Sequence, residues 1–199
     1  MKNKKQRKAA WITTYNEQIC EIFCNYKFDI ICIDLEHSQI SMTECTKLIR
    51  IIKLYNKLAF IRLTSKSMLD LNRYLDFGID GLIVPNINNL KDCENIIKQI
   101  YYPPIGNRGV GLHRANNYGD NFSRYFNKLS KNIEFISIIE TKEAVENLDE
   151  ILSADNLNGV MIGPYDLSTS LGSSGNFSSK IFKDSIKKIK IKTKKYKKQ

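Results

Sequence analysis

The sequence predicts an α/β fold of the (β/α)₈ TIM-barrel type, incomplete, with about six βα units present. Short apolar runs alternate with helix-period segments along almost the whole chain, as in parallel strands joined by crossover helices. Three of the runs end near an acidic residue: Asp34, Glu140 or Asp166. In a barrel the loops after all strands meet on one face, whereas a doubly wound open sheet, which also fits the pattern, would spread them along an edge. The acidic residues therefore favour the barrel.

Six apolar runs are predicted to be strands. The run "DIICID" is almost continuously apolar, as expected when both faces of a strand are covered. The six runs cover residues 9–14, 29–34, 58–63, 81–85, 133–140 and 159–163.

Helix-period segments separate these runs. Ser41 and Glu44 have the spacing of a capping box that opens one helix, and Gly78 is the expected end of another. The other helices are predicted over 17–27, 67–77, 90–100, 142–152 and 180–198, with an irregular stretch at 101–121 and a short helix beginning at "GPYD". The first helix is predicted to bury one stripe, formed by Ile19, Ile22, Phe23 and Tyr26.

The 199 residues suffice for one domain with a core, and the hydrophobic content is an ordinary 42%. No apolar stretch has the length of a membrane span, and the N-terminus does not resemble a signal peptide. We therefore expect a soluble cytoplasmic protein. Its cysteines show no metal-binding spacing and are expected to be reduced and mostly buried: Cys20, Cys24, Cys32, Cys45 and Cys93.

The net charge of +10 is concentrated at the ends of the chain. Residues 1–8 carry five positive charges and residues 183–199 carry a net eight, which leaves the body, 9–182, at −3. We expect a basic N-terminal tail over 1–8, a partial barrel domain over 9–182 and a Lys-rich helix or tail over 183–199. Solvated ends are the simpler interpretation, so a nucleic-acid partner is unlikely and a membrane partner is not expected.

Several polar residues near the strand ends suggest chemistry. Two carboxylates, Glu140 and Asp166, suit Mg²⁺ or Mn²⁺, although helix N-termini also favour acids. Arg62 could hold the oxygen of a 2-oxo acid and stabilise an enolate, or simply form a surface ion pair. Asp34 could orient His37 as a base, unless that histidine is merely solvated.

Six segments together resemble a known family. They occur in the order "IDLEHS" (33–38), "IRL" (61–63), "LDFGIDGLIVPNINN" (75–89), "YYPPIGNRGVGLHRANNYG" (101–119), "IIETKEAVENLDEIL" (138–152) and "GPYDLSTSLG" (163–172). Their order and spacing resemble the HpcH/HpaI aldolases, the metal-dependent class II pyruvate aldolases of the phosphoenolpyruvate-binding barrel superfamily. The resemblance extends from about Trp11 to about Phe182.

The resemblance implies a carbon–carbon lyase that cleaves 4-hydroxy-2-oxo acids to pyruvate and an aldehyde through a metal-bound enolate. It assigns the divalent metal to Glu140 and Asp166, and the substrate's keto oxygen to Arg62. It assigns acid–base chemistry at the aldol hydroxyl to His37 and Asp34, acting with a metal-bound water.

The resemblance also implies where the substrate's carboxylate binds and how chains associate. It places that carboxylate near Gly163, Tyr165 and Asp166, where the helix N-terminus offers free N–H groups. Asp76 matches a position that reaches into a neighbouring subunit's site, which implies a homo-oligomer. Trp11 is expected to lie in the core.

The sequence departs from the family pattern in two places. Ile138 stands where the family commonly has Gln, and the last two βα units are missing, so unpaired strand edges and weak activity are expected. The alternatives are a related lyase of CoA esters, of the citrate lyase β-subunit or malyl-CoA type, and a truncated inactive remnant of the family.

Overall fold

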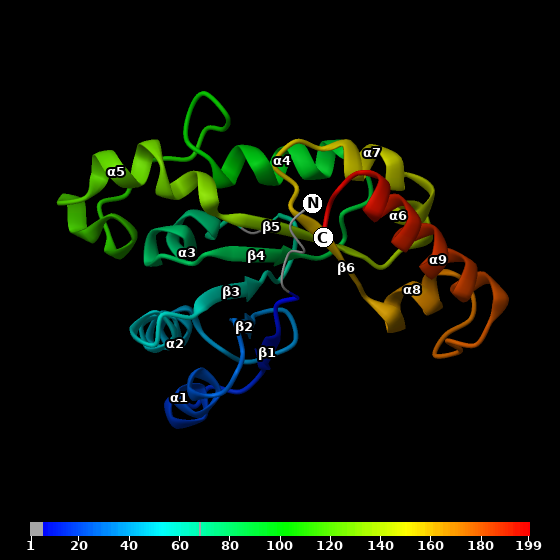
Figure 1. Cartoon of the computed structure of the whole chain (residues 1–199), viewed down its shortest axis with the longest axis horizontal. Coiled ribbons are helices and arrows are strands. Elements are labelled where there is room, and N and C mark those ends of the chain that lie inside the picture. The colour runs from blue at the N-terminus through cyan, green and yellow to red at the C-terminus, as the bar shows by residue number, and fades with distance from the viewer. Residues whose placement is uncertain (1–5, 68) are drawn as a thin grey trace.

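The computed structural model describes residues 6–67 and 69–199. Its centre is one sheet in which six parallel strands follow each other in chain order and curl into an open half-barrel (Figure 1). This confirms the predicted incomplete barrel. The strands are β1 (Ala9–Ile12), β2 (Ile30–Asp34), β3 (Leu58–Arg62), β4 (Gly81–Val84), β5 (Glu134–Ile139) and β6 (Gly159–Ile162).

Helices pack on the convex side of the sheet (Figure 1). The longer ones are α1 (Glu17–Asn25), α2 (Met42–Leu54), α4 (Leu90–Ile100) and α9 (Lys180–Lys195). The shorter ones are α3 (Leu71–Phe77), α5 (Phe122–Asn127), α6 (Lys142–Glu146), α7 (Leu148–Ser153), α8 (Pro164–Ser170) and the 3₁₀ turns η1 (Arg114–Gly119) and η2 (Leu129–Asn132).

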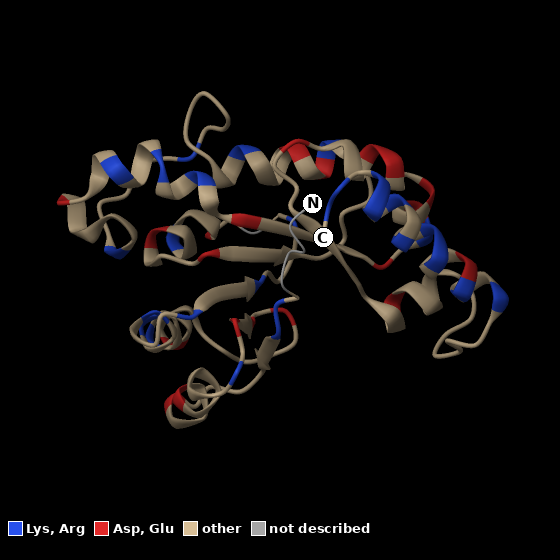
Figure 2. Ribbon diagram, in the orientation of Figure 1, with Lys and Arg blue, Asp and Glu red and all other residues tan. Residues whose placement is uncertain are grey.

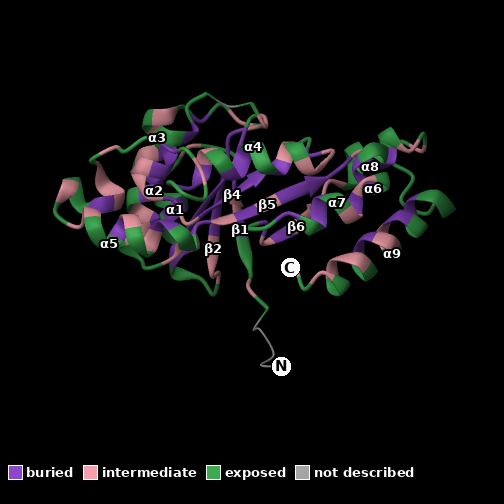
Figure 3. Ribbon diagram, turned by 90° about the horizontal axis from the view of Figure 1, so that it is seen from above, coloured by how far each residue is buried: buried purple, intermediate pink, exposed green. Residues whose placement is uncertain are grey.

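Two apolar clusters lie on the two faces of the sheet, and the buried positions run along its strands (Figure 3). The larger cluster fills the space between strands and helices. The smaller one lines the concave face and centres on Cys32, Phe60, Ile83 and Ile138. Gly81 belongs to this concave face because a Cβ there would lie 2.4 Å from the ring of Phe60 on the neighbouring strand.

Three of the four residues in the apolar stripe predicted on the first helix are exposed, and only Phe23 among them packs, half-buried, against the core. On α1 the side chains of Ile19, Ile22 and Tyr26 are 42%, 52% and 63% exposed. Cys20 and Cys24, four residues apart, face the core instead, because their small thiols allow α1 to approach α2 closely. All five cysteines are free and buried, as the sequence predicts.

One predicted helix start and one predicted helix end are confirmed, whereas two other predictions of helix extent differ from the structure. The hydroxyl of Ser41 and the carboxylate of Glu44 form the expected capping box at the start of α2. Gly78 ends α3 in the left-handed conformation, with φ 93°. The helix predicted over 67–77 begins only at Leu71, and the one over 142–152 is divided at Asn147 into α6 and α7.

The Lys-rich end of the chain is mostly helical and contacts the body. Helix α9, whose lysines are seen in Figure 2, buries Phe182 and Ile189 against the core. After it, Gln199 lies beside β6, where its carbonyl accepts a 2.8 Å hydrogen bond from the backbone N–H of Val160. At the other end, Arg7 forms a 2.6 Å ion pair with Glu134 at the start of β5. No helix in the described part of the chain is long and apolar enough to cross a membrane.

Candidate active site

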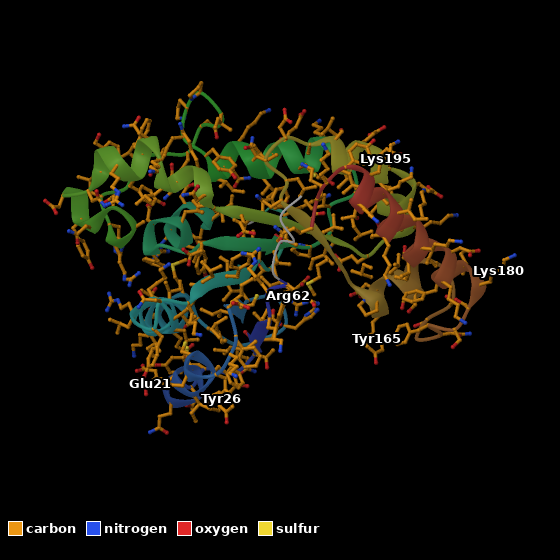
Figure 4. The ribbon with its side chains drawn as sticks, in the orientation of Figure 1. Glu21, Tyr26, Arg62, Tyr165, Lys180 and Lys195 are labelled. Atoms are coloured by element: carbon orange, nitrogen blue, oxygen red, sulfur yellow. The ribbon has the colours of Figure 1, made fainter. Side chains whose placement is uncertain are left out.

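The predicted site residues lie at the carboxyl ends of the strands, where a barrel carries its chemistry. The β2–β3 register pairs Asp34 directly with Arg62. Glu140 follows β5, and Gly163 follows β6 as the N-cap of α8. Figure 4 shows Arg62 at the carboxyl end of β3, in the hollow of the curved sheet.

Asp34 is the buried centre of this group, with only 1% of the residue exposed. Its carboxylate accepts hydrogen bonds from both arms of the Arg62 guanidinium, one of them 2.8 Å long, and from Trp11 Nε1 at 3.2 Å. The backbone N–H groups of Glu36 and His37 donate to it at 2.9 and 3.1 Å. Burial by itself would raise the pKa of Asp34, but the hydrogen bond from Arg62 and the other donors outweigh it and lower that pKa.

Arg62 connects two carboxylates to an aromatic ring. Besides Asp34 it pairs with Glu36, at 3.2 Å, and its guanidinium carbon lies 5.6 Å from the centre of the Trp11 ring. Trp11, which was expected in the core, packs half-buried against the concave apolar cluster and also donates to the site's central carboxylate. Its indole N–H, which needs a partner when buried, was the signal in the sequence that could have identified it.

His37 touches Asp34 through its backbone. Among the described residues, the hydrogen bond between them is made by the His37 backbone N–H, and the predicted pairing of its imidazole with the carboxylate is not present. Its side chain lines a cavity of about 460 Å³ that also includes Thr13, Thr14 and Glu44. Arg62, Glu140 and Asp166 do not line this cavity, so it does not join His37 to the other candidate residues, and the role of His37 as a base remains a prediction.

Glu140, Glu36 and Asp166 concentrate negative charge around Arg62. Glu140 is 7% exposed and accepts a 2.6 Å hydrogen bond from the backbone N–H of Asn86. Burial raises the pKa of Glu140 against that hydrogen bond, and the charges of Glu36 and Asp166 raise it further. Burial likewise raises the pKa of Glu36. Repulsion of this kind favours binding of a cation.

The carboxylates fit a hard divalent ion with an incomplete set of protein ligands. Within residues 6–67 and 69–199, no three His, Cys, Asp or Glu side chains are grouped so as to hold a metal. Two carboxylates such as Glu140 and Asp166 would leave the other positions of such an ion to water and substrate, as is usual for Mg²⁺, and their role as ligands remains a prediction. A Cβ at Gly163 would lie 2.9 Å from Glu140 Oε2, so a glycine is required where β6 passes this carboxylate.

The start of α8 offers backbone donors next to Glu140. Leu167 N–H donates to Gly163 O at 2.9 Å, whereas the N–H groups of Tyr165 and Asp166 have no acceptor among the described residues. The Tyr165 side chain is 69% exposed and its ring packs edge-on against Phe177, with centroids 5.1 Å apart. In Figure 4 that side chain points away from the sheet. Any contribution of Tyr165 to binding would therefore come from its backbone.

Asp76 lies away from the other candidates. It sits near the end of α3, which leads into the N-terminal end of β4, and it accepts a 2.7 Å hydrogen bond from the fully buried guanidinium of Arg108. Within one chain it is thus a structural partner of Arg108. The predicted contribution of Asp76 to a neighbouring subunit's site is not tested by a single chain.

The chain matches a known family over most of its length. The model of the HpcH/HpaI aldolase/citrate lyase family matches residues 7–197. A hydroxypyruvate/pyruvate aldolase of Rhizorhabdus wittichii is 32% identical over 165 residues, which are 82% of this chain and 64% of that protein. A 2-keto-3-deoxy-L-rhamnonate aldolase of Salmonella gallinarum is 31% identical over 82% of this chain and 62% of its own length. The chain thus spans less than two thirds of each relative.

Solved structures share the fold. An HpcH/HpaI aldolase from Desulfitobacterium hafniense superposes with a TM-score of 0.88 at 24% identity, over 98% of this chain and 76% of the other. An HpcH/HpaI aldolase/citrate lyase family protein from Burkholderia cenocepacia superposes with a TM-score of 0.88 at 21% identity. The superposition covers 96% of this chain and 76% of the other. Sequence and fold agree, and this chain belongs to the HpcH/HpaI aldolase/citrate lyase family.

Proposed function

We propose that this chain is a divalent-metal-dependent aldolase that cleaves 4-hydroxy-2-oxo acids to pyruvate and an aldehyde. One observation carries the proposal. A largely buried Arg62–Asp34 pair lies beside Glu36 and Glu140, whose pKa values are raised by burial and further by neighbouring negative charges, at the carboxyl end of the sheet. Such a site combines a fixed positive group for a developing anion with a place for a cation. Membership of an aldolase family supports the same conclusion.

Glu140 and Asp166 are the proposed ligands of Mg²⁺ or Mn²⁺. When bound, such an ion would act as a Lewis acid that polarises the oxygens of the 2-oxo acid. The free N–H groups of Tyr165 and Asp166, next to Gly163, would hold the substrate's carboxylate.

Arg62 is the proposed electrostatic stabiliser of the enolate. As the C3–C4 bond breaks, its electron pair becomes negative charge on the keto oxygen, and a guanidinium held in place in advance stabilises that charge. Asp34 provides this orientation, because it binds both arms of the guanidinium from a buried position. It thereby keeps Arg62 from rotating toward solvent.

His37 is the proposed base. It takes the proton from the C4 hydroxyl, directly or through a water, the C3–C4 bond breaks and the aldehyde leaves. Return of a proton to C3 of the enolate then gives pyruvate. Asp34 fixes the backbone of this loop by accepting the N–H groups of Glu36 and His37.

The test is release of pyruvate from 4-hydroxy-2-oxo acids by the purified chain, with Mg²⁺, with Mn²⁺ and with a chelator. We expect metal-dependent turnover that Asp166→Asn and His37→Asn abolish. The matched control is Asp155→Asn, an exposed acid outside the site, which should leave turnover unchanged. A folded sample without turnover would overturn the proposal. Cleavage of CoA thioesters in place of free acids would indicate the related lyase.

We also propose that the chain forms a homo-oligomer in which Asp76 serves a neighbour's site. Light scattering would give the assembly size. Asp76→Asn and His37→Asn chains, each inactive alone, should regain part of the turnover when mixed. Mixed samples that remain inactive would contradict a shared site.

A further inference from the structure

A cavity of about 590 Å³ opens at the end of the sheet opposite the candidate active site. Its polar lining comes from the end of α2, from the segments that enter β4 and β5, and from η1, and comprises Lys53, Asp80, Arg114, Asn117, Tyr118 and Asn132. Asp80 and Asn86 stand at the two ends of β4. At about 3.3 Å per residue, the four residues of β4 alone separate the cavity by about 13 Å from the end of the sheet that carries the proposed metal site.

The charge of this cavity is unbalanced. Lys53 Nζ binds both oxygens of Asp80 at 2.7 Å, and Asp80 also accepts the Ala59 N–H at 2.8 Å, so this pair is neutral and satisfied. Arg114 forms no ion pair with any residue that the structure describes. Its one hydrogen bond there goes to the backbone carbonyl of Phe77, at 3.3 Å.

A second guanidinium makes this arrangement less favourable. Burial lowers the pKa of Arg114, and the positive charge of Arg50 lowers it further, against smaller opposing effects of Tyr118 and then Asp80. A half-buried guanidinium that forms no ion pair with a described carboxylate, and that lies close to another positive charge, is costly unless a counter-ion binds. The open space beside Arg114 is where such an ion would fit.

The wall that carries Arg114 is held in an unusual conformation. Asn117 and Tyr118 follow each other in the left-handed region, with φ 53° and 55°. For non-glycine residues this costs about 1–3 kcal/mol each, and such strain is concentrated at ligand-binding turns. The buried side chain of Asn116 maintains the turn, because it accepts the N–H groups of His113 and Gly119 at 3.1 and 3.0 Å.

We propose that this cavity binds a small organic oxyanion, a carboxylate or a phosphate, with Arg114 as its principal ligand. The planar fork of a guanidinium matches both groups. Asn117, Tyr118 and Asn132 supply further polar atoms, and Ile79, Leu129 and Ile133 supply apolar walls for the rest of the molecule. The site is separate from the strand ends that carry the proposed aldolase chemistry, and its existence does not depend on that chemistry.

Binding of inorganic phosphate and of succinate to the full chain, measured by calorimetry and by NMR of the arginine side chains, tests the proposal. We expect saturable binding of at least one probe and about tenfold weaker binding to Arg114→Gln, the loss of one charge-assisted contact. Comparison of the two probes tells phosphate from carboxylate. The matched control is Arg73→Gln, which removes an exposed guanidinium paired with Asp70 on α3 and should bind as the wild type does.

Two further variants keep the proposal testable if Arg114→Gln does not fold. Arg114→Lys keeps the charge but loses the fork, and should bind between wild type and Arg114→Gln. Arg50→Gln changes an exposed side chain and should weaken binding by a smaller factor, because it removes only the second charge. Absence of saturable binding to the wild type, or equal binding by wild type and Arg114→Gln, would overturn the site. Neither result depends on whether the chain turns over an aldol substrate.

Discussion

Loss of the Arg62–Asp34 pair should destabilise the fold more than loss of any surface charge. Arg62→Met keeps most of the side-chain volume and leaves the Asp34 carboxylate, 1% exposed, without its counter-charge. Removal of one partner of a buried pair costs about 3–5 kcal/mol. We expect a value near the lower end, about 3 kcal/mol, because Trp11 and two backbone N–H groups still donate to Asp34.

The free energy of unfolding that Arg62→Met loses relative to the wild type should depend on pH in a defined direction. In the wild type the pKa of Asp34 is lowered from 3.8, so its contribution to stability is present above that value and disappears as the pH falls through the folded-state pKa. In Arg62→Met, the hydrogen bond and charge of the guanidinium are lost while burial remains, so we expect the folded-state pKa of Asp34 to be higher than in the wild type. Ionised Asp34 then contributes less stability as the pH rises, and the difference from wild type is largest near pH 7.

Urea unfolding at pH 7 and at pH 4 measures this difference. The matched control is Arg73→Met, which breaks an exposed i,i+3 pair with Asp70 and should cost about 0–1 kcal/mol. Combining Arg62→Met with Asp34→Asn should recover part of the loss, because no uncompensated charge then remains buried. A loss below about 1 kcal/mol, or one that does not shrink at pH 4, would refute the reasoning.

Three other substitutions test separate features. Burial raises the pKa of Glu140 above 4.5, so its ionised form costs stability as the pH rises. Glu140→Gln should therefore melt no lower than wild type at pH 7, yet lose any Mn²⁺-induced increase in Tm; a retained increase would contradict its role as a ligand. Gly81→Ala overpacks the concave face and should cost about 1–3 kcal/mol by urea unfolding, whereas Gly109→Ala, whose Cβ would meet nothing within 4 Å, should be neutral. Ser41→Ala removes a capping-box hydroxyl and should cost about 1 kcal/mol by the same assay.

The strands were predictable to within one or two residues, because each is a short apolar run bounded by polar or turn residues. Helix α5, "FSRYFN", was missed because it is only six residues long, although Phe122, Tyr125 and Phe126 have the helical spacing of an apolar stripe. The buried face of α1 was assigned wrongly because large aliphatic residues were given more weight than Cys20 and Cys24. Only close packing of α1 on α2 makes a small thiol the better core residue there.

The site was predictable as a set of residues but not as a network. The positions of Asp34 and Arg62 at the ends of neighbouring strands follow from the sequence, whereas their pairing depends on the β2–β3 register, which the sequence does not encode locally. The same limitation applies to Trp11, whose indole reaches Asp34 only because β1 lies beside β2. The backbone donor that Asn86 offers to Glu140 carries no side-chain signal at all.

The strictly sequential order of the strands has a consequence for how the molecule opens. Every strand pairs only with its neighbours in the chain, so the sheet behaves as a row of six units, each held by the next. Among the described residues, the inner strands have two partner strands, whereas β1 has one, and β6 has one together with a backbone hydrogen bond to Gln199. Fraying should therefore start at the two ends of the row, and native-state hydrogen exchange should be slowest in β3 and β4 and faster in steps toward β1 and β6. Asp34 and Arg62 would then stay in place during openings that already release the start of α8.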